Sequence, residues 1–258
     1  MALTSQVEGF QPRAQWSPST PITRLLFHLR LTADLQTNSI YRDLRKHLAS
    51  FSGKLLDIGC GSSPFRHLLD PTISEYHGID VEEASSFGYR NPHAIYYDGK
   101  VIPFADQFFD GLLCTEVLEH VLEPSELIDE MHRVLKRGGL GIITIPWSAR
   151  VHYKPFDYHR YTPSALETIF QPFDYRMISS RGTDVSSIAS KIVVCYIRNL
   201  LRIKPSDMKN CLFAPLRVLN ALLGIPILLV ALILGHCGIL FGLGSMDDPL
   251  GYTIIVKK

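Results

Sequence analysis

Residues 54–61 combine a short apolar run with one acidic residue and two glycines, a pattern suited to holding a charged ligand. The apolar residues predict a strand buried on both faces, interrupted by Asp57 near its carboxyl end. Gly59 and Gly61 permit a tight turn that lets the backbone approach a ligand closely. Pro64 suits the first position of a following helix. Strand, glycine turn and helix start together predict a ligand cradle at the carboxyl edge of an α/β sheet.

This cradle does not fit a dinucleotide. A dinucleotide loop needs Gly-x-Gly-x-x-Gly, and Pro64 stands in place of the last glycine. The stretch instead resembles the first motif of the class I S-adenosylmethionine (SAM)-dependent methyltransferases, of the type 11-like kind, in which an acidic residue precedes Gly-x-Gly. Ser63 replaces the family's third glycine and is still small. The alternative is a turn that only joins a strand to a helix. The resemblance implies that SAM is the cofactor and that its first contacts are Asp57, Gly59, Cys60 and Gly61.

Two further acidic residues follow at strand ends. A second predicted strand ends at Asp80, where a carboxylate can accept hydrogen bonds from ribose hydroxyls, with the next two glutamates as competitors. The stretch that begins at Asp98 resembles the family's pattern of Asp, four residues, Pro-Phe and then Phe-Asp. That match implies that Asp98 accepts a hydrogen bond from the adenine amino group and that Gly99 lies against the ring.

A second group of matches follows the fourth strand. Residues 117–121, Val-Leu-Glu-His-Val, are among the most recognisable strings of this superfamily. A helix is predicted over 124–136, with Gly138 and Gly139 as its left-handed cap. The fifth strand is predicted over 140–145, directly before a proline.

The matches from residue 54 to residue 146 stand in the family's order, and with a later Arg-Tyr-Thr segment they cover about half the chain. They imply an α/β fold: a Rossmann-like seven-stranded sheet with helices on both faces and an antiparallel last strand. Helices before the sheet either close one side of the pocket or cover a sheet edge. The other predicted elements are helices over 21–31, 39–48, 65–69 and 163–170, a loop over 84–93, and strands over 173–179 and 251–257.

Three histidines are candidates for acid–base chemistry. Methyl transfer to a hydroxyl requires removal of a proton, and histidine titrates near neutrality. The candidates are His120, His152 and His159, which their sequence positions do not rank. The last two lie in an aromatic-rich segment after the fifth strand, at the edge where α/β folds bind ligands. Asp157 is placed to orient a neighbouring ring.

Glu116, Glu119 and His120 also form a candidate metal site. They resemble the Glu-x-x-Glu-His element of small-RNA 3′-end methyltransferases and ubiquinone-pathway O-methyltransferases, where it binds a divalent ion. Helical spacing would put Glu116 and His120 on one face, and Glu116 is at the same time a predicted SAM contact. The favoured interpretation has no metal: the side chains pair with Arg160 or cap a helix.

The composition of the chain indicates its cellular compartment and excludes some classes of partner. The net charge of +1 gives no basic excess of the kind that nucleic-acid binding requires. The five cysteines include no Cys-x-x-Cys pair, which favours reduced thiols in the cytosol. The first residues show no basic start and no apolar run, so we expect no secretory signal.

Residues 182–249 separate two strands that should be neighbours in sequence. Residues 188–203 predict an amphipathic helix with a basic side. The run 218–243 is long enough to cross a bilayer, but a single crossing would put the last two strands on opposite sides of it. Two glycine-containing breaks therefore favour a bent or re-entrant hairpin, flanked by a basic helix in the interface with anionic lipids. The alternative is a lid or a dimer interface.

The predicted organisation is a loose tail over 1–19, a SAM-binding core over 20–181, the apolar insertion over 182–249 and a last strand within 250–258. The expected function is SAM-dependent O-methylation of a small or lipid-linked acceptor at the cytosolic face of a membrane. One alternative is a soluble small-molecule methyltransferase whose insertion is a lid or dimer interface. Another is a non-catalytic, membrane-bound interaction module that keeps the SAM fold.

Overall fold

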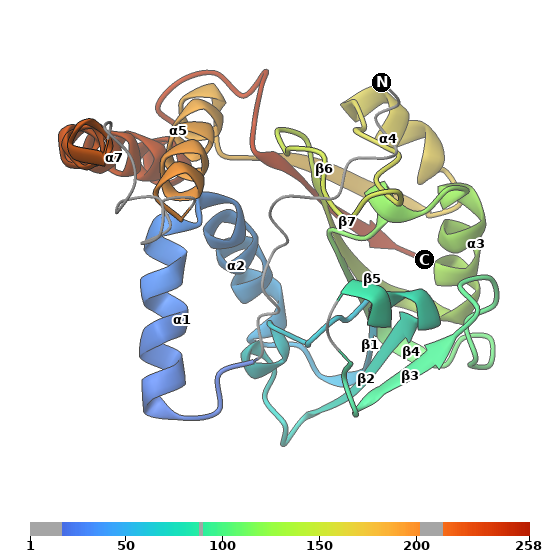
Figure 1. Ribbon diagram of the computed structural model, residues 1–258. Coiled ribbons are helices and arrows are strands. Elements are labelled where there is room, and N and C mark those ends of the chain that lie inside the picture. Colours follow the sequence, from blue (N-terminus) through green and yellow to red (C-terminus); the bar gives the residue numbers. More distant parts are fainter. Residues whose placement is uncertain (1–16, 88–89, 202–213) are drawn as a thin grey trace.

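The computed structural model describes residues 17–87, 90–201 and 214–258, so most of the predicted tail lies outside the described residues. A seven-stranded sheet has the order β3-β2-β1-β4-β5-β7-β6, parallel except for β7 (Figure 1). The strands are β1 (Gly53–Ile58), β2 (Ser74–Val81), β3 (Ala94–Tyr97), β4 (Phe109–Thr115), β5 (Leu135–Pro146), β6 (Tyr175–Arg181) and β7 (Gly251–Lys257). The α-helices are α1 (Pro21–Ala33), α2 (Leu35–Leu48), α3 (Pro124–Val134), α4 (Pro163–Ile169), α5 (Asp184–Leu201) and α7 (Ala214–Phe241). The predicted fold class is confirmed.

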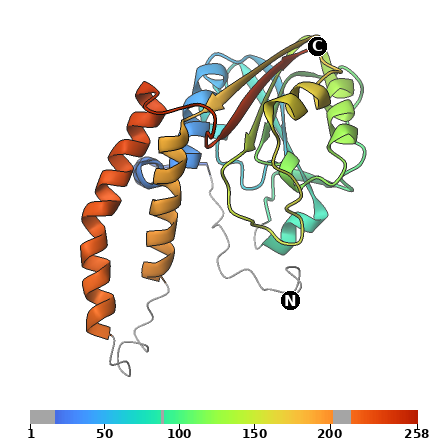
Figure 2. The same ribbon diagram turned by 90° about the horizontal axis from the view of Figure 1, so that it is seen from above.

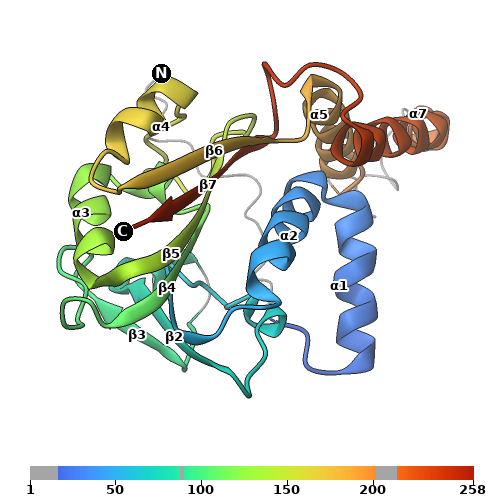
Figure 3. The ribbon, with the colours of Figure 1, turned by 180° about the vertical axis from the view of Figure 1, so that it is seen from behind.

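Helices cover both faces of this sheet. Figures 1 and 3 show α3 and α4 on one face and α1 and α2 on the other. The strand β1 lies between β2 and β4, and its Leu55, Leu56 and Ile58 are at most 1% exposed. Burial on both faces explains the unbroken apolar run around Asp57.

Two local predictions are wrong. The residues after the glycine turn form only a short 3-10 helix, Arg66–Leu68, in place of a helix over 65–69. Ser63 has a φ of 53°, so the turn continues past the glycines and uses residues that a helix would need. The helix α3 ends at Val134, and Gly138 lies inside β5 without capping a helix. Its N–H donates to Lys258 O, so sheet hydrogen bonding replaces the predicted helical cap.

The insertion forms a helical hairpin of a kind that the sequence did not predict. α5 and α7 lie side by side and run in opposite directions (Figure 2). α7 is continuous through Pro226, so the predicted breaks within the apolar run are wrong. A Cβ at Gly235 would lie 2.4 Å from Leu35 Cδ1, so this glycine is a point of close helix packing and not a break. The segment 202–213, which joins the two helices, lies outside the described residues.

One part of α7 is long and apolar enough to span a bilayer. Among the described residues, the single helical segment long and apolar enough to span a bilayer is Leu222–Phe241, and 17% of its residues are buried. A core helix of a soluble protein would be mostly buried. This segment therefore presents an apolar surface that the rest of the described chain leaves uncovered.

Both ends of the insertion meet at a buried arginine. Arg181, at the end of β6, pairs in register with Gly251 and is 2% exposed. Its guanidinium donates to Glu116 Oε1 at 2.7 Å and to Ser39 Oγ at 3.0 Å. It also donates to the carbonyls of Ile145 (3.1 Å) and Tyr252 (3.4 Å). One side chain thereby joins the sheet edge to α2 and to the loop after β4.

We expect Arg181→Ala to lower the free energy of unfolding by about 3 kcal/mol or more, because it leaves a cavity and removes the donors of buried acceptors. Urea unfolding followed by circular dichroism measures this. Lys257→Ala, at an exposed position of the neighbouring strand, is the control and should change the value by less than about 0.5 kcal/mol. Equal stability of the two variants would contradict the assigned role.

Candidate functional site

A cavity of about 370 Å³ lies at the carboxyl edge of the central strands. The turn after β1, the end of β2 and the loop after β4 form its floor, and α1 and α2 close one side. Its lining includes Gly59, Cys60, Gly61, Asp80, Gly99, Glu116, His120 and His152. Six of the predicted SAM contacts and two of the predicted bases are therefore at one site.

The glycine turn is held in one conformation by its neighbours. Gly59 has a φ of 63°, and a Cβ there would lie 2.5 Å from Val117 Cγ2. The N–H of Gly61 donates to Asp80 Oδ2 at 3.0 Å, and Asn91 Nδ2 donates to Gly61 O at 2.9 Å. The backbone is thus open to the cavity on one side and fixed on the other, as a close-fitting ligand cradle requires.

Two carboxyl groups of the cradle have raised pKa values. Burial raises the pKa of Asp80, and the N–H groups of Val81 and Gly61 offset part of this effect. Asp57 lies beneath the turn and does not line the cavity. Burial raises its pKa to about 7, against a hydrogen bond of 2.6 Å from Tyr76 Oη. Asp57 Oδ1 has no hydrogen-bond partner among the described residues.

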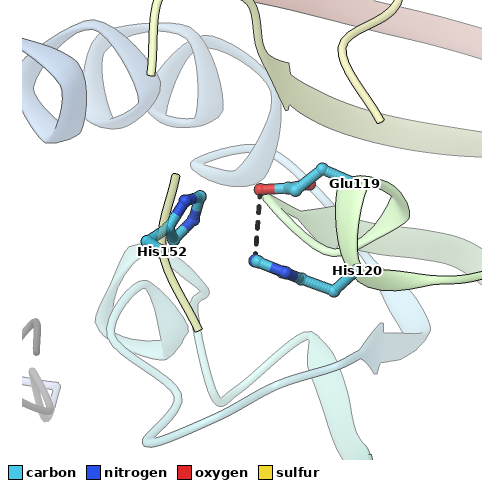
Figure 4. A group of neighbouring side chains, drawn as sticks. All are labelled: Glu119, His120 and His152. Atoms are coloured by element: carbon cyan, nitrogen blue, oxygen red, sulfur yellow. Dashed lines mark ion pairs between the residues drawn. The ribbon is translucent and has the colours of Figure 1, made fainter. Parts of the chain in front are cut away.

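Beside the same cavity, Glu119, His120 and His152 converge (Figure 4). They offer three ligand atoms that all lie within 4.8 Å of one another. His120 Nδ1 lies 2.7 Å from Phe156 O, and since a carbonyl only accepts, Nδ1 carries the proton. Its Nε2 is then a free acceptor, 3.6 Å from Glu119 Oε1. The ring of His152 packs against it edge-on, with 4.7 Å between centroids.

Burial decides the charge of this cluster. Glu119 is fully buried, and neither of its carboxyl oxygens has a hydrogen-bond partner among the described residues. Desolvation, and next the charge of Glu116, raise the pKa of Glu119 well above its usual range. Desolvation and then the neighbouring His152 lower the pKa of His120. At neutral pH the imidazole of His120 is therefore neutral, and burial disfavours the ionised form of the neighbouring Glu119 carboxyl group.

An arginine clamp supports the second histidine. Asp157 accepts two hydrogen bonds from Arg160, at 2.7 and 3.0 Å, and one from the backbone N–H of His152 at 2.9 Å. His152 Nδ1 lies 2.9 Å from Arg150 O, so here too the proton is on Nδ1 and Nε2 is an acceptor. This geometry fits the expectation that Asp157 orients a ring.

Comparisons with known proteins match the central part of the chain. A methyltransferase domain profile matches residues 56–143. An uncharacterized protein of Methanocaldococcus jannaschii is 36% identical over 104 residues, 40% of this chain and 48% of that protein. The ubiquinone biosynthesis O-methyltransferase of Idiomarina loihiensis is 28% identical over 181 residues, 54% of this chain and 74% of that enzyme.

A solved structure shows that the likeness extends to the fold. A SAM-dependent methyltransferase from Archaeoglobus fulgidus superposes with a TM-score of 0.50 at 21% identity, over 91% of this chain and 99% of that one. Residues 56–143 match a methyltransferase domain, and the chain has the fold of a SAM-dependent methyltransferase. The match spans about half of the M. jannaschii relative, so the activity of the whole protein is taken up below as a proposal.

The side chains that converge here differ in one member from the predicted metal set, and a metal-binding role of that set stays a prediction. Glu116 turns toward α2 and the end of β6, where it pairs with Arg181 at 2.7 Å and accepts from Gln36 Nε2 at 3.0 Å. His152 takes its place in the cluster. Helical spacing failed because Glu116 has a φ of 53° and only Leu118–His120 forms a helical turn.

Three predicted site residues, Asp57, Asp98 and His159, lie outside the cavity lining. Asp98 is exposed and accepts from the N–H of Lys100 at 2.9 Å, while its neighbour Gly99 reaches the cavity. His159 Nε2 lies 3.3 Å from Leu122 O. An adenine contact for Asp98 and a base role for His159 stay predictions, and the geometry favours the other two histidines.

Several residues that shape the site were not predicted. Arg30, Thr37 and Ile40 line the cavity from α1 and α2, which fits the expectation that these helices close one side of the pocket. Tyr153 lines the cavity from the loop after β5. Asn91 holds the glycine turn, yet it lies in a segment with no motif. Such contacts depend on tertiary packing and leave no local pattern.

We expect Asp57→Asn to reduce the loss of stability that occurs as the pH rises. The folded pKa of about 7 lies above the ordinary 3.8, so the native state binds more protons between these values, and stability contributed by Asp57 falls as pH rises through that window. Asn keeps the shape and cannot ionise. Thermal unfolding at pH 5 and pH 8 measures this. Between these two pH values the free energy of unfolding of the wild type should fall by roughly 2–4 kcal/mol more than that of the variant. A parallel pH dependence for both proteins would contradict a raised pKa.

Proposed function

We propose that this protein is a SAM-dependent methyltransferase that methylates an oxygen atom of a small or lipid-linked acceptor at the cytosolic face of a membrane. The observation that carries the proposal is one cavity with two different walls. One wall is the glycine cradle with Asp80, and the other presents two imidazoles whose Nε2 atoms accept protons.

The cradle fits SAM. Asp80 is placed to accept hydrogen bonds from the ribose hydroxyls, and the turn at Gly59 and Gly61 lets the backbone approach the ligand. Gly99 offers a flat position for the adenine ring. When bound, SAM supplies an activated methyl group on a positively charged sulfur. The chain's own task is then to align the acceptor and to remove its proton.

His120 is the best-placed base. Its Nδ1–H is held by Phe156 O, which fixes the ring and keeps the lone pair on Nε2. Because burial and the neighbouring His152 lower its pKa, His120 is neutral at pH 7 and can accept a hydroxyl proton. His152 has the same tautomer and is the second candidate. The buried Glu119 lies beside the proton-accepting nitrogen of His120.

The same three side chains suit a divalent cation, since imidazole nitrogen and carboxylate oxygen are common metal ligands. Proton removal by His120 needs no such ion. A metal is therefore an alternative use of this cluster, and its removal separates the two interpretations.

The proposed acceptor is based on the similarity to a named relative and on the exposed apolar segment of α7. One relative, matched over 74% of its own length, is named a ubiquinone biosynthesis O-methyltransferase. This name supports oxygen as the acceptor atom. The exposed apolar segment Leu222–Phe241 supports work at a membrane. A lipid-linked acceptor would account for both.

We expect the purified protein to bind SAM and Asp80→Ala to weaken that binding at least tenfold, because two hydrogen bonds to a charged group are lost. Isothermal titration calorimetry measures this. Asp174→Ala, an exposed acid far from the cavity, is the matched control and should bind like the wild type. A folded protein that does not bind SAM would leave the non-catalytic interaction module as the better description.

We expect His120→Ala to reduce methyl transfer by about 10² to 10⁴-fold, the usual contribution of a general base, with SAM affinity within about twofold of the wild type. The assay is transfer of labelled methyl from SAM to a membrane lipid extract. Wild-type activity should fall only below pH 6.5, because the pKa of His120 lies under that value.

The same assay with a chelator tests the metal. Activity that survives chelation supports the histidine base. Activity that is lost and then restored by Mg²⁺ or Mn²⁺ would assign the cluster to a metal instead.

A further inference from the structure

A second cavity, of about 630 Å³, lies between α1 and α2 on the side away from the cradle, and its lining is basic. His28, Arg42, Arg45 and Lys46 line it together with Asn38 and Tyr41, and no acidic residue does. Lys46 is paired with Asp43 at 2.8 Å. Arginine and lysine side chains around a polar hollow suit a phosphate group.

The outer face of α1 is apolar beside this basic cavity. Ile22, Leu25, Leu26 and Leu29 follow helical spacing and are 55–72% exposed. The opposite face of the same helix carries the buried Phe27. A solvent-exposed helix normally presents polar residues outward, so these four residues form an uncovered apolar stripe.

α7 continues this apolar surface. His236 Nε2 lies 2.9 Å from Thr32 O, so the two helices touch near the end of α1. Figures 1 and 3 show α1 from the side and α7 nearly along its axis at the same edge of the molecule, so the helices run crosswise. The most exposed apolar residues of α7 are Leu222, Leu223, Ile227, Ile233 and Phe241, at 58–81%.

We propose that α1 and α7 together lie along the surface of an anionic bilayer, with the basic cavity between α1 and α2 receiving lipid phosphate groups. This inference rests on the proposed membrane function and deepens it. Apolar side chains beside cationic ones match the boundary between acyl chains and anionic headgroups. A second copy of the chain fits less well, because a two-fold interface would bring the same cationic residues toward each other.

The arrangement also relates the membrane to the catalytic cavity. α1 contributes Arg30 to that cavity and His28 to the basic one. The apolar stripe lies on the helix face between these two residues. With α1 on the bilayer, one wall of the catalytic cavity borders the lipid, which suits an acceptor that stays in the membrane.

Vesicle flotation of the full chain tests this, with phosphatidylcholine vesicles with and without phosphatidylglycerol. We expect the double variant R42Q/R45Q to bind the anionic vesicles about tenfold more weakly and to lose the preference for phosphatidylglycerol. L25S/L26S should weaken binding to both kinds of vesicle about tenfold. R137Q, at an exposed position near the start of β5, is the matched control and should bind like the wild type. Unchanged SAM affinity confirms that each variant is folded.

The outcomes are distinguishable. If the wild type floats with neither kind of vesicle, the proposed membrane function and this inference are both refuted. Wild type that floats while both double variants float equally well would refute this inference alone. Saturable binding of inorganic phosphate that R42Q/R45Q abolishes, without any effect on flotation, would assign the cavity to free phosphate. A stable dimer in light scattering that L25S/L26S dissociates would assign the stripe to a second copy.

Discussion

The guanidinium group of Arg181 joins parts of the molecule that are far apart in sequence. It is fully buried, and its donors reach α2, β5, β7 and the loop after β4. A buried cation is costly unless its donors are satisfied, so these contacts constrain one another. Glu116, its charged partner, also accepts from Gln36 of α2. The wall that α2 contributes to the catalytic cavity is therefore fixed by the same interaction that holds the sheet edge.

Acidic residues dominate the charge of the site. Asp57, Asp80 and Glu119 are all buried, and the pKa of each is raised because burial disfavours the ionised form. Arg181 and Arg160 are committed to Glu116 and Asp157. Of these three acids only Asp80 lines the cavity, so its carboxyl group is the one that a bound ligand can reach.

Structure was predicted most accurately from the sequence where one local pattern determines it. The buried strand with Asp57, the glycine turn and the strand end at Asp80 depend on nearest neighbours. The strand 251–257 was predicted to the residue, because alternating or continuous apolar runs mark strands well. The fold itself came from the order of motifs. Prediction failed where tertiary pairing decides, as at Gly138, whose N–H finds a sheet acceptor, and at Glu116, whose partner Arg181 is 65 residues away.

The apolar insertion shows how a sheet constrains helices far from it. β6 and β7 pair in register from Tyr175 to Arg181, so the chain leaves and re-enters at one corner of the sheet. Any helix that departs there must be matched by a helix that returns, and α5 and α7 satisfy this as an antiparallel pair. The turn expected inside the apolar run is then unnecessary, and α7 continues through Pro226. Because α5 and α2 cover one side of α7, the remaining apolar surface faces outward from Leu222 to Phe241. Sheet pairing thus determines which hydrophobic surface is left uncovered, and that surface lies beside the wall of the catalytic cavity.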